Sequence, residues 1–356
     1  MENEQLTFIV PAYNAENTLA TTLDSIVRQI SPSWRIIIVN DGSTDKTEDI
    51  AQEYVRKYPR KVRYLYQQNK GLGGARNSGM DLADTAYISF LDSDDWIKAD
   101  YVKNIVDQIQ KCDKEKPEII LTLPEIYDEN SKCVQPWYDE PLFHSIFSQD
   151  GICTNPQKDK RLYRTDVSQC RKVLQTEFVR RIRFRFHEHV KWEDIAPHFY
   201  LMTHCRKCMG VGSTGFYYRK GSEYQITASR GKDRLDLITV YNDLLPYLNK
   251  PDRELIYAVM RIMVSFANEG VKLADTEIRR QLVLELHQFF KAVPRSCDRI
   301  LYRHAKRYLV KSEVRQYYIF LFVIRHRLLL RVFYDYLYRD ASEQILKKMI
   351  RKFIRK

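Results

Sequence analysis

A chain of 356 residues can bury one large hydrophobic core or two smaller ones, and 44% hydrophobic with 29% charged residues is a globular balance that excludes a disordered chain. The net charge of +12 is uneven, because residues 295–356 hold 17 Lys and Arg against 5 Asp and Glu and the other 294 residues are close to neutral. The C-terminal segment should therefore favour anionic surfaces or acidic partners, although no nucleic-acid-binding module is recognisable.

The beginning of the chain shows no export signal. It enters the apolar run Leu6–Val10 without a basic segment, a long apolar segment or a small-residue cleavage site. Seven cysteines at irregular spacings resemble reduced thiols more than a disulfide framework, and Cys205 and Cys208 have no second ligand pair that would complete a zinc site. Both features predict a cytoplasmic protein.

Up to residue 125, strand and helix patterns alternate with short connections. A helical apolar face contains Leu19, Leu23 and Ile26, and a second helix is expected to open at Asp45 with Glu48 as its capping-box partner. Apolar runs predict strands at residues 6–10, 36–39, 62–66, 86–91 and 118–123, with a further helix at residues 101–109. Repeated βαβ units form a mainly parallel sheet flanked by helices, and ligands of such sheets bind beyond the carboxyl ends of the strands.

The remainder of the chain is of two kinds. Residues 126–225 contain several prolines and aromatic residues and are expected to hold loops and short strands that complete a site. From about Gly231 the pattern is helical throughout, with little Gly or Pro. This predicts an α/β domain over residues 1–230 and an all-helical, basic domain over residues 231–356.

Polar residues follow the first two predicted strands where each ends. Residues 11–14 are Pro-Ala-Tyr-Asn, and residues 40–45 are Asn-Asp-Gly-Ser-Thr-Asp. An aspartate such as Asp41 can accept a hydrogen bond from N3 of a uracil, and the glycine after it lets the backbone approach a flat base. Either motif alone is also an ordinary turn.

A glycine-rich segment joins the third predicted strand to a helix. Residues 69–77, Asn-Lys-Gly-Leu-Gly-Gly-Ala-Arg-Asn, supply a flexible turn, a helix N-terminus and two cations, Lys70 and Arg76, near where phosphates could lie. The segment matches neither the dinucleotide-binding pattern nor a P-loop. A dehydrogenase or an NTPase is therefore disfavoured.

An acidic cluster follows the fourth predicted strand, where residues 92–96 are Asp-Ser-Asp-Asp-Trp. In an extended segment Asp92 and Asp94 would lie on the same side, and two close carboxylates repel each other unless a cation lies between them. A hard divalent ion with few protein ligands suits this arrangement and would neutralise charge on a departing diphosphate. Taken alone, the cluster is more typical of a solvated acidic turn.

In combination and in this order, the four segments resemble the family 2 glycosyltransferases of GT-A fold, over roughly residues 5–225. The resemblance implies a metal-dependent, inverting transferase that moves a hexose or N-acetylhexosamine from a UDP-sugar, with Mg2+ or Mn2+ as the ion. Its acceptor would be a hydroxyl of a growing glycan, either lipid-linked or on a glycoprotein, in bacterial surface-polysaccharide or glycoprotein glycan assembly.

The same resemblance assigns roles to residues of these motifs. Asp41 and Arg76 would contact the nucleotide base, and Tyr13 would pack against it. Asp92 would hold the ribose and Asp94 would ligate the metal, while Asp95 is expected to be structural. The other residues predicted to bind the nucleotide sugar are Pro11, Asn14, Lys70, Ser93 and Arg219.

The family also has a Glu-Asp pair at the start of a later helix, matched here by Glu193 and Asp194. Inversion requires in-line attack by the acceptor hydroxyl, so a carboxylate must take its proton on the face opposite the leaving nucleotide. Asp194 is the predicted base, with Glu193 orienting the substrate. Without the resemblance, an acidic pair at this position would be a helix-dipole partner.

Two basic features allow two interpretations each. Arg219 follows two tyrosines and precedes Ser222 and Thr227, as in the aromatic-Arg segment of the family, and either faces the diphosphate or is a surface arginine. The four arginines between residues 180 and 185 either bind a phosphate-bearing acceptor or form a solvated basic face.

The apolar run Tyr317–Ile324 near the C-terminus is too short to span a bilayer. Arg-rich, aromatic helices suit peripheral contact with the inner face of a membrane, with Phe320, Phe322, Leu328 and Phe333 buried in it. A helical bundle that packs on the enzyme or forms a homo-oligomer is equally compatible with the pattern.

Two other functions stay open. A sugar-phosphate nucleotidyltransferase of similar fold would carry a glycine- and arginine-rich loop after the first strand, where this chain has Pro-Ala-Tyr-Asn. A non-catalytic scaffold with a vestigial transferase domain is disfavoured, because every expected acidic position is occupied.

Overall fold

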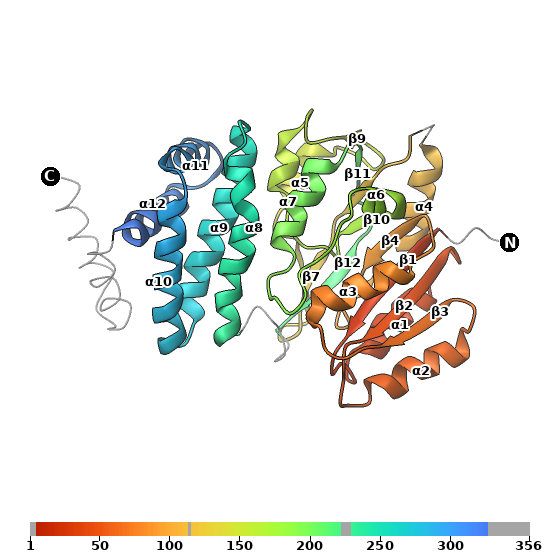
Figure 1. Cartoon of the computed structure of the whole chain (residues 1–356). Helices are drawn as coiled ribbons and strands as arrows, with labels where there is room; N and C mark the ends of the chain where they lie inside the picture. Colours follow the sequence, from red (N-terminus) through yellow and green to blue (C-terminus); the bar gives the residue numbers. More distant parts are fainter. Residues whose placement is uncertain (1–4, 113–114, 222–228, 327–356) are drawn as a thin grey trace. The chain divides into compact units, whose positions relative to one another are not determined.

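The computed structural model describes residues 5–112, 115–221 and 229–326, which divide into two compact units at the gap before residue 229 (Figure 1). The first unit is an α/β domain with two sheets, and the second consists of helices. Ser222, Thr227, Leu328 and Phe333, singled out in the sequence, lie outside the described residues.

Eight strands form the main sheet of the first unit, in the order β3-β2-β1-β4-β10-β6-β11-β9. β10 is antiparallel to both β4 and β6, β9 is antiparallel to β11, and the other pairs are parallel. The sheet is therefore mixed but mainly parallel. Its strands are β1 (Leu6–Ala12), β2 (Trp34–Asn40), β3 (Val62–Tyr66), β4 (Tyr87–Phe90), β6 (Ile119–Thr122), β9 (Cys153–Thr154), β10 (Lys172–Gln175) and β11 (Cys208–Val211).

Helices cover both faces of this sheet, which explains why β1 is an unbroken apolar run buried along its whole length. On one face the ring of Phe8 lies 5.8 Å from the ring of Tyr101 in α4. On the other face Ile9 packs directly under Gly79 of α3. The helical elements of the unit are α1 (Leu19–Val27), α2 (Thr47–Lys57), α3 (Gly71–Leu82), α4 (Tyr101–Lys111), α5 (Glu140–Ile146), α6 (Thr176–Arg181), α7 (Ile195–His204) and a 3-10 turn, η1 (Lys160–Arg164).

A smaller sheet has the order β5-β12-β7-β8. Its strands are β5 (Trp96–Ile97), β7 (Glu125–Asp128), β8 (Cys133–Pro136) and β12 (Phe216–Lys220). β5 follows the acidic residues directly, so the segment between β4 and β5 joins the two sheets. Apart from β5, this small sheet is formed by residues from about 125 to 220, a stretch whose sequence is too irregular to predict strand by strand.

Two predicted details of the N-terminal half are wrong. α2 begins at Thr47 rather than at Asp45, and Glu48 does not cap it, because the Asp45 carboxylate accepts from the Thr47 backbone (3.0 Å) and from the Glu16 backbone (3.0 Å) in the preceding loop. The glycine-rich segment is not a flexible turn either. α3 begins at Gly71, which has a φ of 75°, and Gly73 and Gly74 lie within the helix.

The second unit is built around α9, which packs against α8, α10, α11 and α12. Phe320 of α12 is 4% exposed and lies against Phe290, so of the two interpretations of this apolar run the packed helical bundle, and not burial in a membrane, holds for this side chain. In the part of the chain that the structure describes, no helix has the length and apolar character needed to cross a bilayer. The elements are η3 (Lys232–Leu235), α8 (Asp236–Leu248), α9 (Arg253–Leu273), α10 (Thr276–Ala292), α11 (Arg295–Tyr308) and α12 (Lys311–Arg325).

The packing of α3 on β1 generates a first prediction. A methyl group at Gly79 would lie 2.3 Å from Cγ2 of Ile9, in the middle of the sheet, so Gly79→Ala should lower the free energy of unfolding by about 1–3 kcal/mol. The control is Gly270→Ala in α9, where the nearest atom is a terminal Leu237 methyl at 3.1 Å and the gain in helix propensity offsets the crowding. Thermal unfolding of the two variants measures the difference, and equal midpoints would contradict the tight packing.

Candidate active site

The loops that follow β1 and β2 are tied together at the carboxyl edge of the sheet. Asn14 donates from its backbone to Ser43 Oγ (3.0 Å), and its own Oδ1 accepts from the Thr44 backbone (2.9 Å). Asn14 adopts a φ of 48°, which an asparagine tolerates better than most residues. The two polar strand ends predicted from the sequence therefore form one structure, with Tyr13 55% exposed beside them and Pro11 buried in β1.

Asp41 lies at the base of this edge and is nearly buried. Its Oδ1 accepts from the Gln67 side chain (2.6 Å) and from the Lys70 backbone (2.8 Å), while the described residues give Oδ2 no hydrogen bond. The residue after it, Gly42, has a φ of 78° and adopts the left-handed conformation that favours glycine. The carboxylate is thus fixed in place with one oxygen left to accept from a ligand.

The acidic cluster is a tight turn, not an extended segment. The Asp95 backbone donates to the Asp92 carbonyl (3.1 Å), so the expected alternation of side chains does not apply. Asp95 is buried, and burial together with neighbouring Asp94 raises its pKa well above the ordinary value. Burial and the charge of Asp92 raise the pKa of Asp94 to about 6. Asp92 and Ser93 stay partly accessible.

Arg219, near the end of β12 in the smaller sheet, forms hydrogen bonds with this turn. Its backbone donates to Asp95 Oδ1 (2.9 Å), its Nε donates to the Asp94 carbonyl (2.9 Å), and its Nη1 pairs with Glu129 (2.7 Å). The guanidinium also lies 4.9 Å from the centre of the Trp96 ring. Arg219 is therefore not a plain surface arginine, and its guanidinium is bound to the chain itself.

Arg76 is the centre of the site. Its side chain is 1% exposed, and its Nη2 pairs with Asp92 Oδ1 (2.9 Å) while its Nη1 pairs with Glu193 Oε1 (2.9 Å) and Asp194 Oδ1 (2.5 Å). The three carboxylates raise the pKa of Arg76 well above its ordinary value, against the opposing effect of burial. The expected contact of Arg76 with a nucleotide base does not fit this structure, because its guanidinium is enclosed and ion-paired.

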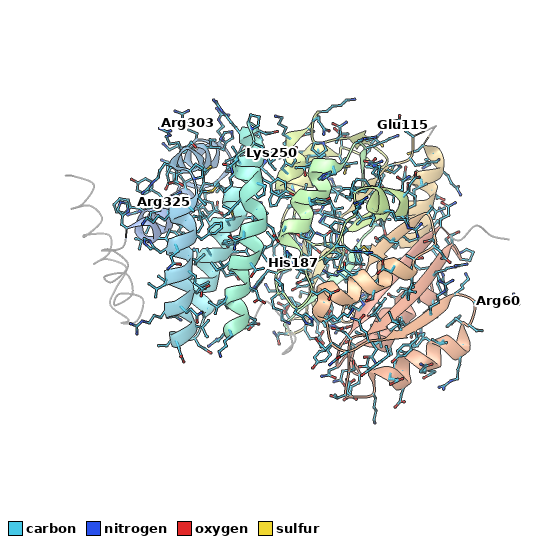
Figure 2. All side chains as sticks on the ribbon, viewed as in Figure 1. Arg60, Glu115, His187, Lys250, Arg303 and Arg325 are labelled. Carbon is cyan, nitrogen blue, oxygen red and sulfur yellow. The ribbon has the colours of Figure 1, made fainter. Side chains whose placement is uncertain are left out.

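The sequence of α3 explains how a helix brings an arginine to this point. A Cβ at Gly73 would lie 2.0 Å from the His187 carbonyl, so only glycine lets α3 approach the segment that contains His187, labelled in Figure 2. Three residues later comes Arg76. Asn77 then exchanges two hydrogen bonds with the Phe186 backbone, both 2.9 Å. The motif therefore sets the distance between α3 and the chain that leads to Glu193.

Glu193 and Asp194 directly precede α7, as the sequence predicts. Asp194 Oδ2 accepts from the Gln169 backbone (3.2 Å), and the Gln169 side chain donates to the Asp194 carbonyl (3.1 Å). Glu193 is buried, and burial together with the charge of Asp194 raises its pKa to about 7 despite the opposing effect of Arg76.

The backbone that leads to this pair is conformationally costly. His189 and Trp192 have φ values of 56° and 65°, which bulky residues rarely adopt, and Arg183 has a φ of 53°. Such conformations persist where surrounding contacts hold them, and here His189 donates to the Lys70 carbonyl (2.8 Å) beside Gly71. Strain of this kind is concentrated at functional sites.

The structure thus gathers most of the predicted residues in two neighbouring groups. Arg76 joins Asp92 to Glu193 and Asp194, and the turn that holds Asp94 is continuous with Asp92. The loops with Tyr13, Asn14 and Asp41 adjoin the same strand ends, and the Lys70 backbone links them to α3. Sequence reasoning missed Gln169 and Cys170, whose Sγ lies 3.9 Å from Arg76 Nη2, because no recognisable motif contains them.

The arginines between residues 180 and 185 fit neither proposed interpretation fully. Arg180 donates to the Ala83 carbonyl (2.8 Å), Arg181 pairs with Glu118 (2.6 Å) and Arg185 pairs with Asp81 (2.5 Å). These side chains fasten the segment to neighbouring elements. A phosphate would have to compete with those partners.

Comparison with known proteins gives the same family as the motifs. Residues 7–170 match the family model described as glycosyl transferase family 2. The chain is 34% identical over 151 residues to the putative glycosyltransferase EpsH of Bacillus subtilis, covering 41% of this chain and 43% of EpsH. It is 29% identical over 262 residues to the minor teichoic acid biosynthesis protein GgaB of the same organism, covering 71% of this chain and 28% of GgaB. The chain spans less than half the length of these relatives.

Solved structures share the fold. S. aureus TarS 1-349 in complex with UDP-GlcNAc matches with a TM-score of 0.63 at 19% identity, covering 90% of this chain and 91% of that one. GalNAc-T7 with UDP, GalNAc and Mn2+ matches with a TM-score of 0.52 at 13% identity, covering 82% of this chain and 58% of that one. The chain has the GT-A fold followed by a helical region.

The ion pairs of Arg76 generate the second prediction. Arg76→Met should lower the free energy of unfolding by about 3 kcal/mol, because the carboxylates around it lose their shared partner. Arg35→Met, which removes an ion pair to half-exposed Asp84, should cost below about 1 kcal/mol. Chemical denaturation measures both.

The effect of pH provides a check on this interpretation. The pKa of Glu193 in the folded chain, about 7, lies above its ordinary value of 4.5, so this carboxyl favours folding below pH 4.5 and loses that contribution as the pH rises through its folded value. Without Arg76 the folded pKa rises further. The difference in free energy of unfolding between the wild type and Arg76→Met should therefore grow as the pH rises toward 8 and above, by roughly 1 kcal/mol or more. A deficit independent of pH would contradict the role given to Arg76.

Proposed function

We propose that this chain, whose residues 7–170 match the model of glycosyl transferase family 2, is a glycosyltransferase of that family. It would transfer a hexose or N-acetylhexosamine from a UDP-sugar to a hydroxyl group of a growing glycan, with inversion at the anomeric carbon. The observation that carries the proposal is the bond of one buried guanidinium, that of Arg76, to carboxylates from two separate parts of the chain. It holds the acidic turn after β4 at a fixed distance from the pair before α7.

The loops after β1 and β2 are the proposed nucleotide site. Asp41 Oδ2 can accept from N3 of uracil, and the exposed ring of Tyr13 can pack against the base. Asn14, Lys70, Asp92 and Ser93 border the same edge and would contact the ribose and phosphates. The structures of TarS with UDP and with UDP-GlcNAc support a UDP donor for this chain.

The acidic turn fits a divalent cation such as Mg2+ or Mn2+. The described residues contain no group of three His, Cys, Asp or Glu side chains that could hold a metal ion. An ion at the acidic turn would therefore be bound by few protein ligands and by phosphate oxygens of the donor. Asp94 would be its ligand, because no cation among the described residues is bonded to its carboxylate and the charge of Asp92 lies close by. When bound, such an ion neutralises charge on a departing diphosphate.

Asp194 is the proposed general base. Arg76 and the Gln169 backbone each bond one of its oxygens, which fixes the plane of the carboxylate, and each oxygen retains a lone pair for a substrate proton. Glu193 shares Arg76 and would orient the substrate or its partner carboxylate. Arg76 is thus a positioning residue rather than a contact for the base of the nucleotide.

The acceptor is proposed from chemistry and from the relatives. A hydroxyl of a glycan, lipid-linked or on a glycoprotein, is consistent with a base that takes a proton. The match to a teichoic acid biosynthesis protein supports a role in bacterial surface-polysaccharide assembly. A cytoplasmic location would give the enzyme access to the nucleotide sugar.

The third prediction tests the metal ligand. With UDP present, Mn2+ should raise the thermal midpoint of the wild-type chain, and Asp94→Asn should abolish that rise because it removes the negative charge that holds the ion. Asp84→Asn is the matched control, since Asp84 pairs with Arg35 and Arg63 before β4, at the opposite end of that strand. An unchanged response to Mn2+ in the Asp94 variant would reject this ligand.

The fourth prediction tests the base and the function together. A screen of UDP-sugars for donor-dependent transfer or hydrolysis should identify a donor, and Asp194→Asn should then lower the transfer rate by about 10²–10⁴-fold while donor-induced thermal stabilisation persists. Asp81→Asn, on the exposed surface of α3, should leave the rate unchanged. Full turnover by the Asp194 variant would show that Asp194 is not the base. Release of pyrophosphate from a nucleoside triphosphate would indicate a nucleotidyltransferase instead.

A further inference from the structure

We propose that α11 is a docking face for the anionic surface of a lipid bilayer, made of the exposed cations Arg295, Arg299, Arg303, Lys306 and Arg307. This goes beyond the proposed sugar transfer and does not depend on it. It also differs from the surface that the apolar run of the sequence suggested, since Phe320, Leu321, Val323 and Ile324 of that run are buried inside the helical unit.

The spacing of these cations places them on one face of the helix. Counted from Arg295 they stand at positions 0, 4, 8, 11 and 12, which fall within about a third of the circumference of an α-helix. The opposite face packs into the unit through Cys297, Leu301 and Ala305, which are buried. In Figure 2 the labelled Arg303 lies on the outer side of α11. All five cations can therefore approach one flat surface together.

α11 offers little negative charge to offset these cations, with one carboxylate oxygen 3.9 Å from Nη1 of Arg295. Its single acidic residue, Asp298, is buried and pairs with Arg325 of α12 at 2.6 Å. Arg325 also donates to the carbonyls of Phe290 and Val293, which keeps this internal ion pair in place. The exposed charge of the helix is therefore entirely positive.

Exposed apolar and aromatic side chains continue the cationic face at the junction of α11 and α12. Val310 is 64% exposed, and Tyr318 is exposed as well. The ring of Tyr318 lies 5.1 Å from that of Tyr302 in α11. A linear polyanion would gain little from these side chains, whereas the boundary between headgroups and acyl chains accommodates both cations and amphipathic rings. The combination favours a bilayer over a soluble polyanion.

Co-sedimentation of the full chain with vesicles tests the proposal. Vesicles of equal parts phosphatidylglycerol and phosphatidylcholine should bind the protein, with affinity that falls as salt rises, while vesicles of phosphatidylcholine should bind it weakly. Replacing Arg299, Arg303 and Lys306 together with Gln should weaken binding to the anionic vesicles roughly a hundredfold. Equal binding to both kinds of vesicle would overturn the proposal.

A matched control distinguishes an effect of the α11 cations on vesicle binding from an effect of the net charge of the protein. Lys232, Arg253 and Lys272 are exposed cations of the same unit outside α11, and replacing these three with Gln changes the net charge by the same amount. The control triple should change vesicle binding by less than about threefold. If it weakens binding as much as the α11 triple, the effect reflects charge in general and the proposed face is rejected.

A second variant tests the apolar component without weakening the fold. Val310 precedes α12 at the N-cap position, where serine is preferred, so Val310→Ser should keep or raise stability. It should nevertheless weaken vesicle binding by about fivefold, because less apolar surface leaves water. Binding of inorganic polyphosphate tests the alternative ligand. If polyphosphate binds α11 tightly and Val310→Ser leaves vesicle binding unchanged, the face binds a polyanion rather than a membrane.

Discussion

The burial of one guanidinium among three carboxylates governs the geometry of the first unit. A buried arginine is tolerated only where nearby charges and hydrogen bonds replace the water that it loses, so Arg76 requires Asp92, Glu193 and Asp194 to stay within bonding distance. These partners come from a strand end and from the residues before a helix more than a hundred positions later in the chain. One side chain thereby fixes the separation of the groups that a transferase would use at the donor and at the acceptor.

The surrounding contacts serve this arrangement. Gly73 lets α3 touch the His187 carbonyl, Asn77 binds the Phe186 backbone, and Gly79 lets the same helix lie on Ile9. From the other sheet, Arg219 bonds the turn that contains Asp94 and Asp95. The charges that remain after these bonds explain the perturbed acids, since the pKa of Asp94 rises to about 6 and that of Glu193 to about 7 in a site with more carboxylates than cations.

The second unit shows how similar-looking basic residues differ in role. Arg325 is buried and pairs with Asp298, whereas the arginines of α11 lie exposed on one face. Phe320 and Val310 show the same contrast among apolar residues, because the first belongs to the core and the second is open to solvent. Position on the helix, and not residue type, separates the structural residues from those available to a partner.

The sequence of this protein was sufficient to predict the βαβ order and the residues at the strand ends, because these depend on local apolar spacing and on short motifs. The Glu-Asp pair before α7 was predicted from the resemblance to a family, since an acidic pair at a helix start has by itself more than one interpretation. It could not reveal the antiparallel insertion of β10, the turn at Asp92–Asp95 or the enclosure of Arg76, because each depends on residues distant along the chain. Gln169 had no motif to mark it and acquires its place only through Asp194. The sequence could not place Phe320 for the same reason. An apolar residue in a basic helix faces either a core or a partner, and only its packing against Phe290 decides between them.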